Sequence, residues 1–273
     1  MKLIRRVAFS SGHRYWTPWL NEADNRALFG PWASPYNHGH NYVLDVAAEG
    51  EIDPRTGMVV NIKDIDAVLQ NEVVRRFDQK SINDEIVHFQ SHAPTLENLL
   101  SYISSLLSPH FSPGALPATL IHLRLEEMPT LWAELDTKTT MLTVTRTYEF
   151  AASHRLHAPG LSEAENVELF GKCNNLAGHG HNYVLEVTVA GNIDPRTGMS
   201  VDLGELDKAV EERIVDRYDH RNFNEDLPEY RDKVPTSEVI VQQIWDDLDG
   251  HLPAQLSRVR LHETARNVFE LSR

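Results

Sequence analysis

The chain has 273 residues, of which 41% are hydrophobic and 24% are charged, as in folded globular proteins with apolar cores. Its net charge is -14, from 26 basic and 40 acidic residues, so no nucleic-acid partner is expected. The single cysteine, Cys173, excludes an internal disulfide framework and fits a reducing, cytoplasmic compartment. No stretch is typical of a signal peptide or a membrane span, so no membrane partner is expected.

The second half of the chain repeats the first. Residues 52–58 read the same as residues 193–199, at an offset of 141. The offset falls to 136 near the end of each copy, where Glu127 aligns with Glu263. A period this long predicts two tandem domains, at residues 1–138 and 139–273.

The sequence pattern of each copy predicts six elements in the order strand, strand, helix, helix, strand, strand. Alternating residues indicate the strands, and apolar residues at helical spacing indicate the helices. Thr95 and Thr236 are candidate N-caps of the second helices. Each domain is therefore expected to be α+β, a four-stranded antiparallel sheet with two helices on one face. The predicted strands are residues 2–10, 38–47, 118–126 and 131–135 in the first copy, and 143–151, 179–189, 257–263 and 267–271 in the second; residues 16–37 and 156–178 are predicted to be long polar loops.

A His-Gly-His motif occurs once in each copy, on a predicted strand. Residues two apart on a strand share a face, so His38 and His40 point the same way, as do His179 and His181. A third histidine lies 25 residues upstream in each copy, at His13 and His154. A single histidine is usually structural, but the repeated spacing favours ligands. Three neutral imidazoles without thiolates favour Zn²⁺ with one open position.

The second copy carries further candidates for chemistry. Cys173 precedes the second motif closely enough for the loop to bring its sulfur near the metal. Asp219 could orient His220, which could take a proton from the thiol, although the pair also suits an ordinary helix C-terminus. Glu263 is either a solvated strand end or a carboxylate that grips a flat heterocycle by paired hydrogen bonds. The first copy has Trp32 and Gln79 in place of Cys173 and His220.

These residues carry a resemblance to a known family. The stretches 148–156, 170–175 and 178–183, with both copies end to end, resemble 6-pyruvoyl tetrahydropterin synthase and the related 6-carboxytetrahydropterin synthases of queuosine biosynthesis. The resemblance implies the tunnelling fold (T-fold), in which sheets from several domains close a barrel. It implies zinc ligands at His154, His179 and His181, and at His13, His38 and His40 in the first copy. It also implies Cys173 as general base, Asp219 and His220 as its relay, Glu263 as the pterin anchor, matched by Glu127, and a pterin pocket at Thr236, Ser237 and Glu238.

The implied reaction is that of a zinc-dependent lyase acting on 7,8-dihydroneopterin triphosphate with loss of triphosphate. Two alternatives stay open: a 6-carboxytetrahydropterin synthase of queuosine biosynthesis, and a zinc-bearing pterin-binding protein without turnover. The resemblance also implies a homo-oligomer. We expect three chains in a hexamer-like pair of rings, one ring per repeat, with active sites between subunits.

Overall fold

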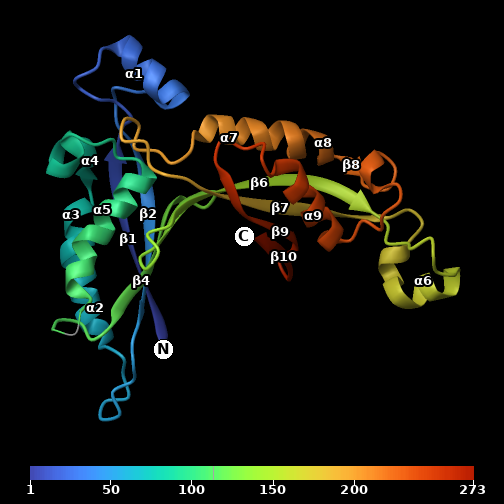
Figure 1. Ribbon diagram of the computed structural model, residues 1–273, viewed down its shortest axis with the longest axis horizontal. Helices are drawn as coiled ribbons and strands as arrows, with labels where there is room; N and C mark the ends of the chain where they lie inside the picture. Colours follow the sequence, from blue (N-terminus) through green and yellow to red (C-terminus); the bar gives the residue numbers. More distant parts are fainter. Residues whose placement is uncertain (113) are drawn as a thin grey trace. The chain divides into compact units, whose positions relative to one another are not determined.

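The computed structural model describes residues 1–112 and 114–273, which form two compact units (Figure 1). Unit 1 comprises Met1–Val144 and Ala190–Val201, and unit 2 comprises Thr145–Val189 and Asp202–Arg273. The units follow the two repeats except for Ala190–Val201, which comes from the second repeat but belongs to unit 1. A sequence boundary between residues 138 and 139 stays a prediction.

Unit 1 is built on four long antiparallel strands in the order β5-β4-β2-β1. A two-residue strand, β3, adds to β1 in parallel, so the sheet is mixed at this edge. The predicted strands are confirmed, and the first two are longer than predicted. Their bounds are β1 (Lys2–His13), β2 (His38–Glu49), β3 (Lys80–Ser81), β4 (Thr119–Met128) and β5 (Leu131–Asp136).

Unit 2 repeats this plan in the order β10-β9-β7-β6, and the two-residue strand β8 pairs with β6 in parallel. The first three residues of β6, Leu142–Val144, belong to unit 1. The bounds are β6 (Leu142–His154), β7 (His179–Ala190), β8 (Arg221–Asn222), β9 (Gln255–Thr264) and β10 (Asn267–Ser272).

The predicted helices pack against the sheets, as α+β architecture requires. In unit 1, α5 (Leu96–Leu107) contacts β4 and β5, and in unit 2, α9 (Ser237–Leu248) contacts β9 and β10. Thr95 and Thr236 cap these helices, accepting hydrogen bonds from the backbone N–H groups of Asn98 and Val239. The first predicted helix of each repeat contains one π-turn between two α-helical parts. These parts are α2 (Ile62–Leu69) and α3 (Arg75–Phe77) in the first repeat, and α7 (Leu203–Val210) and α8 (Asp216–Tyr218) in the second.

The two stretches predicted to be loops each contain a helix, so that prediction was wrong. These helices are α1 (Glu22–Phe29) and α6 (Glu163–Phe170). The signal was present in the sequence, because Ser162 and Glu165 form a reciprocal capping box at the start of α6. Asn21 caps α1 in a similar way, accepting a hydrogen bond from the backbone N–H of Asp24.

The core of each unit lies between the sheet and its helices. Tyr42 and Leu44 on β2, and Tyr183 and Leu185 on β7, are completely buried. These side chains lie on the same face of each strand as the two motif histidines, because residues two apart on a strand point the same way. The histidines therefore lie at the end of the core. Among the described residues, no helix has the length and apolar character to cross a membrane.

Candidate metal and catalytic sites

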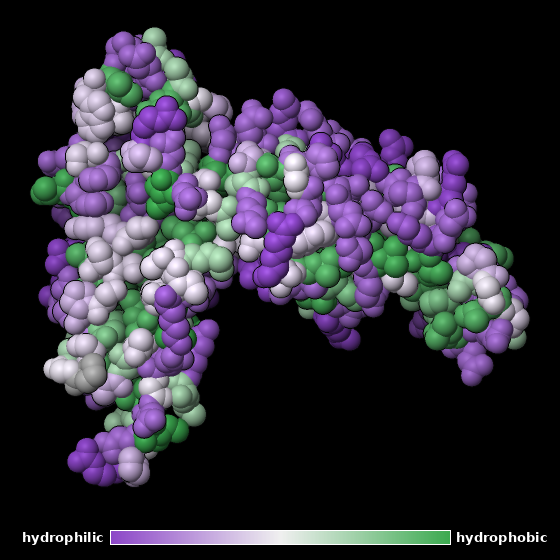
Figure 2. Space-filling model, in the orientation of Figure 1, coloured by the Kyte–Doolittle hydropathy of each residue, from purple (hydrophilic) through white to green (hydrophobic). Residues whose placement is uncertain are grey.

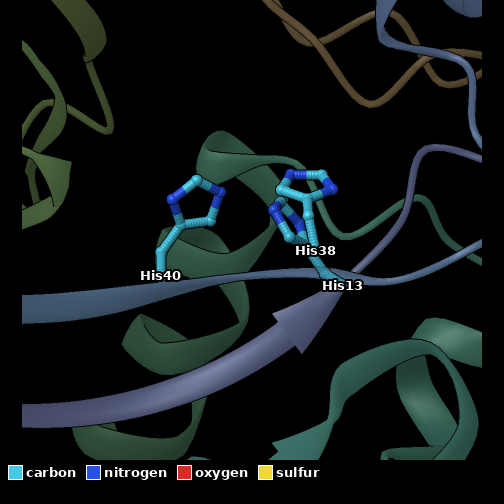
Figure 3. A group of neighbouring side chains, drawn as sticks. All are labelled: His13, His38 and His40. Carbon is cyan, nitrogen blue, oxygen red and sulfur yellow. The ribbon is translucent and has the colours of Figure 1, made fainter.

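The three candidate ligands of the first repeat come together on β1 and β2 (Figure 3). Antiparallel pairing places His13 directly opposite His38, and His40 follows on the same face. The ring centroid of His13 lies 4.4 Å from that of His38 and 5.1 Å from that of His40. The ligand atoms of all three lie within 4.8 Å of one another. The strand-spacing prediction of a three-histidine cluster is therefore confirmed in geometry.

The second repeat builds the same cluster on β6 and β7. The His154 ring lies 4.6 Å from His179 and 5.3 Å from His181, and the two motif histidines are 5.0 Å apart. Here too the ligand atoms lie within 4.8 Å of one another. The two repeats thus hold their imidazoles in nearly identical arrangements.

In each cluster, a hydrogen bond fixes which ring nitrogen of the upstream histidine faces the other two histidines. Nδ1 of His13 lies 2.9 Å from the carbonyl oxygen of Pro94, and Nδ1 of His154 lies 2.8 Å from that of Pro235. A carbonyl only accepts, so Nδ1 carries the hydrogen and Nε2 presents its lone pair. The same carbonyl contact in both repeats therefore leaves Nε2 of the upstream histidine available to a metal ion.

The inward nitrogens are buried but have no hydrogen-bond partner among the described residues. They are Nε2 of His13, His40, His154 and His181, and Nδ1 of His179. Burial lowers the pKa of His13 to about 3 and that of His40 to about 4, and it also lowers the pKa of His154 and His181. Neutral imidazoles with unpaired lone pairs are what a divalent metal requires, so both donor sets fit zinc.

A carboxylate borders the second cluster. Oε1 of Glu263 lies 3.9 Å from Nε2 of both His154 and His181. Ser237 Oγ donates to this carboxylate at 2.7 Å, and Asn267 Nδ2 donates at 3.0 Å. Burial opposes ionisation, but these two hydrogen bonds and the two histidines outweigh it, so the pKa of Glu263 is lowered. Glu263 is therefore a fixed anion beside the cluster rather than a solvated strand end.

The matching carboxylate of the first repeat has other neighbours. Oε1 of Glu127 lies 3.5 Å from Nε2 of His40, and Tyr42 donates to Oε2 at 3.4 Å. Leu96 stands where the second repeat has Ser237, and it is buried. The carboxylate is retained in the first repeat, whereas the hydroxyl that donates to it is replaced by an apolar side chain.

The pair predicted to act as a relay is in contact. Oδ2 of Asp219 lies 2.7 Å from Nδ1 of His220, and Oδ1 accepts a hydrogen bond from the backbone N–H of Ala151 at 2.8 Å. These bonds, the backbone one first, lower the pKa of Asp219. His220 has a left-handed backbone, with φ of 57°, and its side chain is 84% exposed. Asp219 therefore orients an imidazole that projects outward, where another group can reach it.

His220 lines a pocket of about 560 Å³ together with His181 and the start of β7. Cys173 is not among the residues that line this pocket. Its side chain is half-buried, and its carbonyl accepts a hydrogen bond from Leu156. The structure therefore brings His154, His179, His181 and Glu263 together, but does not bring Cys173 and His220 into one pocket of the described chain.

The predicted pterin-pocket residues occupy the start of α9. Ser237 is buried and donates a hydrogen bond to Glu263, whereas Thr236 is half-buried and Glu238 is exposed. The sequence did not predict the role of Asn267 as the second partner of Glu263. The available signal in the sequence was that Asn267 begins a predicted strand and has no matching amide in the first repeat.

The fold and the two sites define a tandem α+β protein with a three-histidine cluster in each repeat. The chain belongs to the 6-pyruvoyl tetrahydropterin synthase family, whose profile matches residues 2–138 and again residues 143–273. The resemblance and the tandem duplication are thereby confirmed, and the protein is an enzyme of the lyase class.

Individual relatives match about one repeat each. A 6-pyruvoyl tetrahydrobiopterin synthase of Poecilia reticulata is 49% identical over 126 residues, covering 46% of this chain and 86% of the relative. The Homo sapiens protein of the same name is 48% identical over 126 residues, covering 46% and 87%. A 6-carboxy-5,6,7,8-tetrahydropterin synthase of Rickettsia conorii is 35% identical over 124 residues, covering 40% and 81%.

Proposed function

We propose that this protein is a zinc-dependent lyase that converts 7,8-dihydroneopterin triphosphate with loss of triphosphate, and that its second domain performs the chemistry. One observation carries the proposal. Only the second repeat combines a cluster of unpaired imidazole nitrogens with a fixed carboxylate and an aspartate-oriented histidine.

In the second domain, His154, His179 and His181 would hold the zinc. The ion would supply Lewis-acid polarisation of the hydroxyls on the substrate side chain. Burial keeps the pKa of His154 and His181 low, so these two ligands remain neutral near neutral pH. Metal binding therefore needs no proton release from these two side chains.

Cys173 would act as the general base, taking a proton from the substrate side chain. His220, held by Asp219, would take the thiol proton and leave the thiolate. Because Cys173 does not line the pocket that contains His220, we assign this relay to the His220 of a neighbouring subunit. The protein would therefore be active as a homo-oligomer, and three two-domain chains would give a hexamer-like particle.

Glu263 would anchor the pterin, because a fixed carboxylate can accept two hydrogen bonds from an amidine-like ring edge. Ser237 already holds one of its oxygens in place, and Thr236 and Glu238 border the same helix start. The first domain, with Gln79 and Trp32 in place of the relay histidine and the base, would bind zinc without turnover.

The test is to incubate the purified full chain with 7,8-dihydroneopterin triphosphate and zinc, and to identify the pterin product by mass spectrometry. A 6-pyruvoyl product with released triphosphate supports the proposal. Formation of 6-carboxytetrahydropterin with acetaldehyde would instead make the protein a 6-carboxytetrahydropterin synthase, as in queuosine biosynthesis. The similarity to the Rickettsia conorii protein is the reason to keep that outcome in view.

A further candidate is a zinc-bearing pterin-binding protein without turnover, suggested by the first domain, which keeps its ligands but not its base. Zinc-dependent turnover that disappears in Cys173→Ala would exclude it. Pterin binding without any product, in protein that contains its full zinc, would favour it.

A further inference from the structure

The loop that carries Cys173 is hydrogen-bonded to residues that directly follow His154 at the end of β6. Leu156 donates its backbone N–H to the carbonyl of Cys173 at 2.9 Å. Arg155 donates from Nε to the carbonyl of Asn174 at 3.1 Å. Two consecutive residues thus hold two consecutive carbonyls, and the backbone at Cys173 has a defined position relative to the strand that ends in His154.

The side chain of Asn174 adds a third contact between the same two segments. Nδ1 of His157 lies 3.1 Å from Oδ1 of Asn174. An amide oxygen only accepts, so this ring nitrogen carries the hydrogen and donates it. Asn174 is 6% exposed, and its Nδ2 is buried without a hydrogen-bond partner in the part of the chain that the structure describes. A buried unpaired amide group costs stability, so packing alone does not explain an asparagine at this position.

The first repeat keeps the backbone contact but not the side chains. Tyr15 forms a parallel bridge with Ala33, and the N–H of Ser34 donates to the Tyr15 carbonyl at 3.4 Å. Ala33 and Trp16 stand where the second repeat has the amide and the imidazole, so the side-chain bond cannot form there. The repeat without a cysteine therefore also lacks the side-chain contact that holds the cysteine loop.

The arginine that follows the first ligand also has different partners in the two repeats. Arg14 donates to both carboxylate oxygens of Asp84, at 2.6 and 2.8 Å, and to the side-chain oxygen of Asn37 at 2.7 Å. Gly178 stands at the position of Asn37 and offers no side-chain acceptor. Arg155 uses its Nε for the carbonyl of the cysteine loop instead.

The loop lies close against the end of β6. Gly178 has φ of 70°, and a Cβ there would come within 3.0 Å of the carbonyl oxygen of His154, so the close approach requires glycine. Within one chain, the helix of this loop packs weakly, because Asn166 is its only buried residue. Leu169 on this helix is 65% exposed, and Figure 2 shows apolar side chains at the surface over α6. The hydrogen bonds at the end of the loop are therefore what fixes Cys173.

We propose that Asn174 is a positioning residue, which together with His157 holds Cys173 at a fixed place beside the strand end that carries His154. The inference rests on the proposed function, in which Cys173 is the general base. A base has to lie within hydrogen-bonding reach of the proton that it removes. A displacement of about 1 Å can lower the rate about 10²-fold, so a base on a loop needs such support. Asn174 acts through the backbone of Cys173 and does not touch the substrate.

The first experiment follows the thiol without any pterin, because Cys173 is the single cysteine of the chain. It measures the rate of alkylation by iodoacetamide in the zinc-loaded full chain, by intact mass. The parent thiol is half-buried. Asn174→Leu keeps the size of the side chain but removes its polar atoms, and should raise the rate about tenfold by loosening the loop. His157→Phe removes the other side of the bond and should have the same effect.

The matched control is Asn71→Leu, which makes the same change at an exposed asparagine of the first repeat. It should leave the alkylation rate unchanged. Circular dichroism checks that each variant is folded, and if Asn174→Leu does not fold, His157→Phe carries the same test.

The second experiment measures steady-state kinetics with the pterin triphosphate. Asn174→Leu should lower kcat about 10- to 100-fold and leave KM within about twofold, because the substrate contacts are elsewhere. His157→Gln retains a donor and should keep most of the kcat that His157→Phe loses. The double variant Asn174→Leu/His157→Phe should be no slower than either single variant, because both changes remove one and the same bond.

An alkylation rate of folded Asn174→Leu that is within twofold of the parent's, or slower, would overturn the inference. So would kcat losses that multiply in the double variant, because they would show that the two side chains act independently. Failure of the proposed function gives a different result. A parent chain without turnover, whose Cys173 still reacts faster in Asn174→Leu and in His157→Phe, would refute the lyase proposal and leave the role of Asn174 in holding Cys173 supported.

Discussion

The two histidine clusters share the same arrangement of three histidines and differ in what surrounds them. Both clusters have the same carbonyl contact, nearly the same ring spacings and a glutamate nearby. The first lacks the serine partner of that glutamate, the relay histidine and the cysteine. Under the proposed function, metal binding and catalysis would therefore depend on separate groups of side chains, and the first domain would keep the first group without the second.

The largest effect is expected on kcat, and it distinguishes the two domains by whether they contain the proposed general base. Cys173→Ala should lower kcat by about 10²- to 10⁴-fold, because a general base contributes that much to a proton transfer. Trp32→Ala changes the corresponding position of the first domain and should leave kcat within about twofold. The measurement is product formation in zinc-loaded protein. Equal losses in the two variants would contradict the division of roles.

The second prediction separates metal binding from turnover. His38→Ala and His179→Ala should each reduce the zinc content from about two ions per chain to about one, since each removes one of three ligands. Only His179→Ala should abolish turnover. Metal analysis after gel filtration, with an activity assay on the same sample, tests both points. A single zinc in the parent would show that only one cluster is filled.

A smaller effect is expected from making the second pocket resemble the first. Ser237→Leu removes the hydroxyl that donates to Glu263, and a hydrogen bond to a charged group contributes about 1.5 kcal/mol or more. We expect kcat/KM to fall about tenfold while zinc content is unchanged. The reciprocal change, Leu96→Ser, should have no effect on turnover. Steady-state kinetics of the two variants distinguishes a pterin anchor from a merely structural contact.

The last predicted effect concerns the acid stability of the zinc-free protein rather than its activity. Burial lowers the pKa of His13 from 6.5 to about 3, so between these values the unfolded chain binds a proton that the folded chain excludes. Stability should therefore fall as the pH drops through this window, by about 2 kcal/mol at pH 5. His13→Gln should flatten the decline in Tm between pH 7 and pH 5 by several degrees. Parallel declines in the parent and the variant would refute this explanation.

Much of the fold could be predicted because each helix and strand occurs once in each repeat, so that its sequence pattern could be compared between the two copies. Strand alternation and helical spacing gave the strands, the long helices and both N-caps. The prediction failed at α1 and α6, where short helices with weak apolar periodicity lie in polar sequence. Their capping residues were visible, but local caps alone do not show whether a segment packs as a helix.

The site residues could be predicted where they lie close together in the sequence. The period of a strand puts two motif histidines on one face, whatever the rest of the chain does. The third ligand required the register between two strands, which was inferred from repetition and is now seen in the pairing of His13 with His38. The partners of Glu263 were not predicted, because Ser237 and Asn267 reach it from a helix start and a strand start.

The sequence by itself determined the duplication, the strand faces, the three clustered histidines of each copy and the absence of Cys173 and His220 counterparts from the first copy. Tertiary structure alone decided which nitrogen of each upstream histidine faces the other two histidines, because the Pro94 and Pro235 carbonyls lie far along the chain. It also decided that the turn at Gly198 belongs to the first unit. The physical reason is that sequence patterns report local geometry, whereas these contacts depend on where distant backbone groups meet.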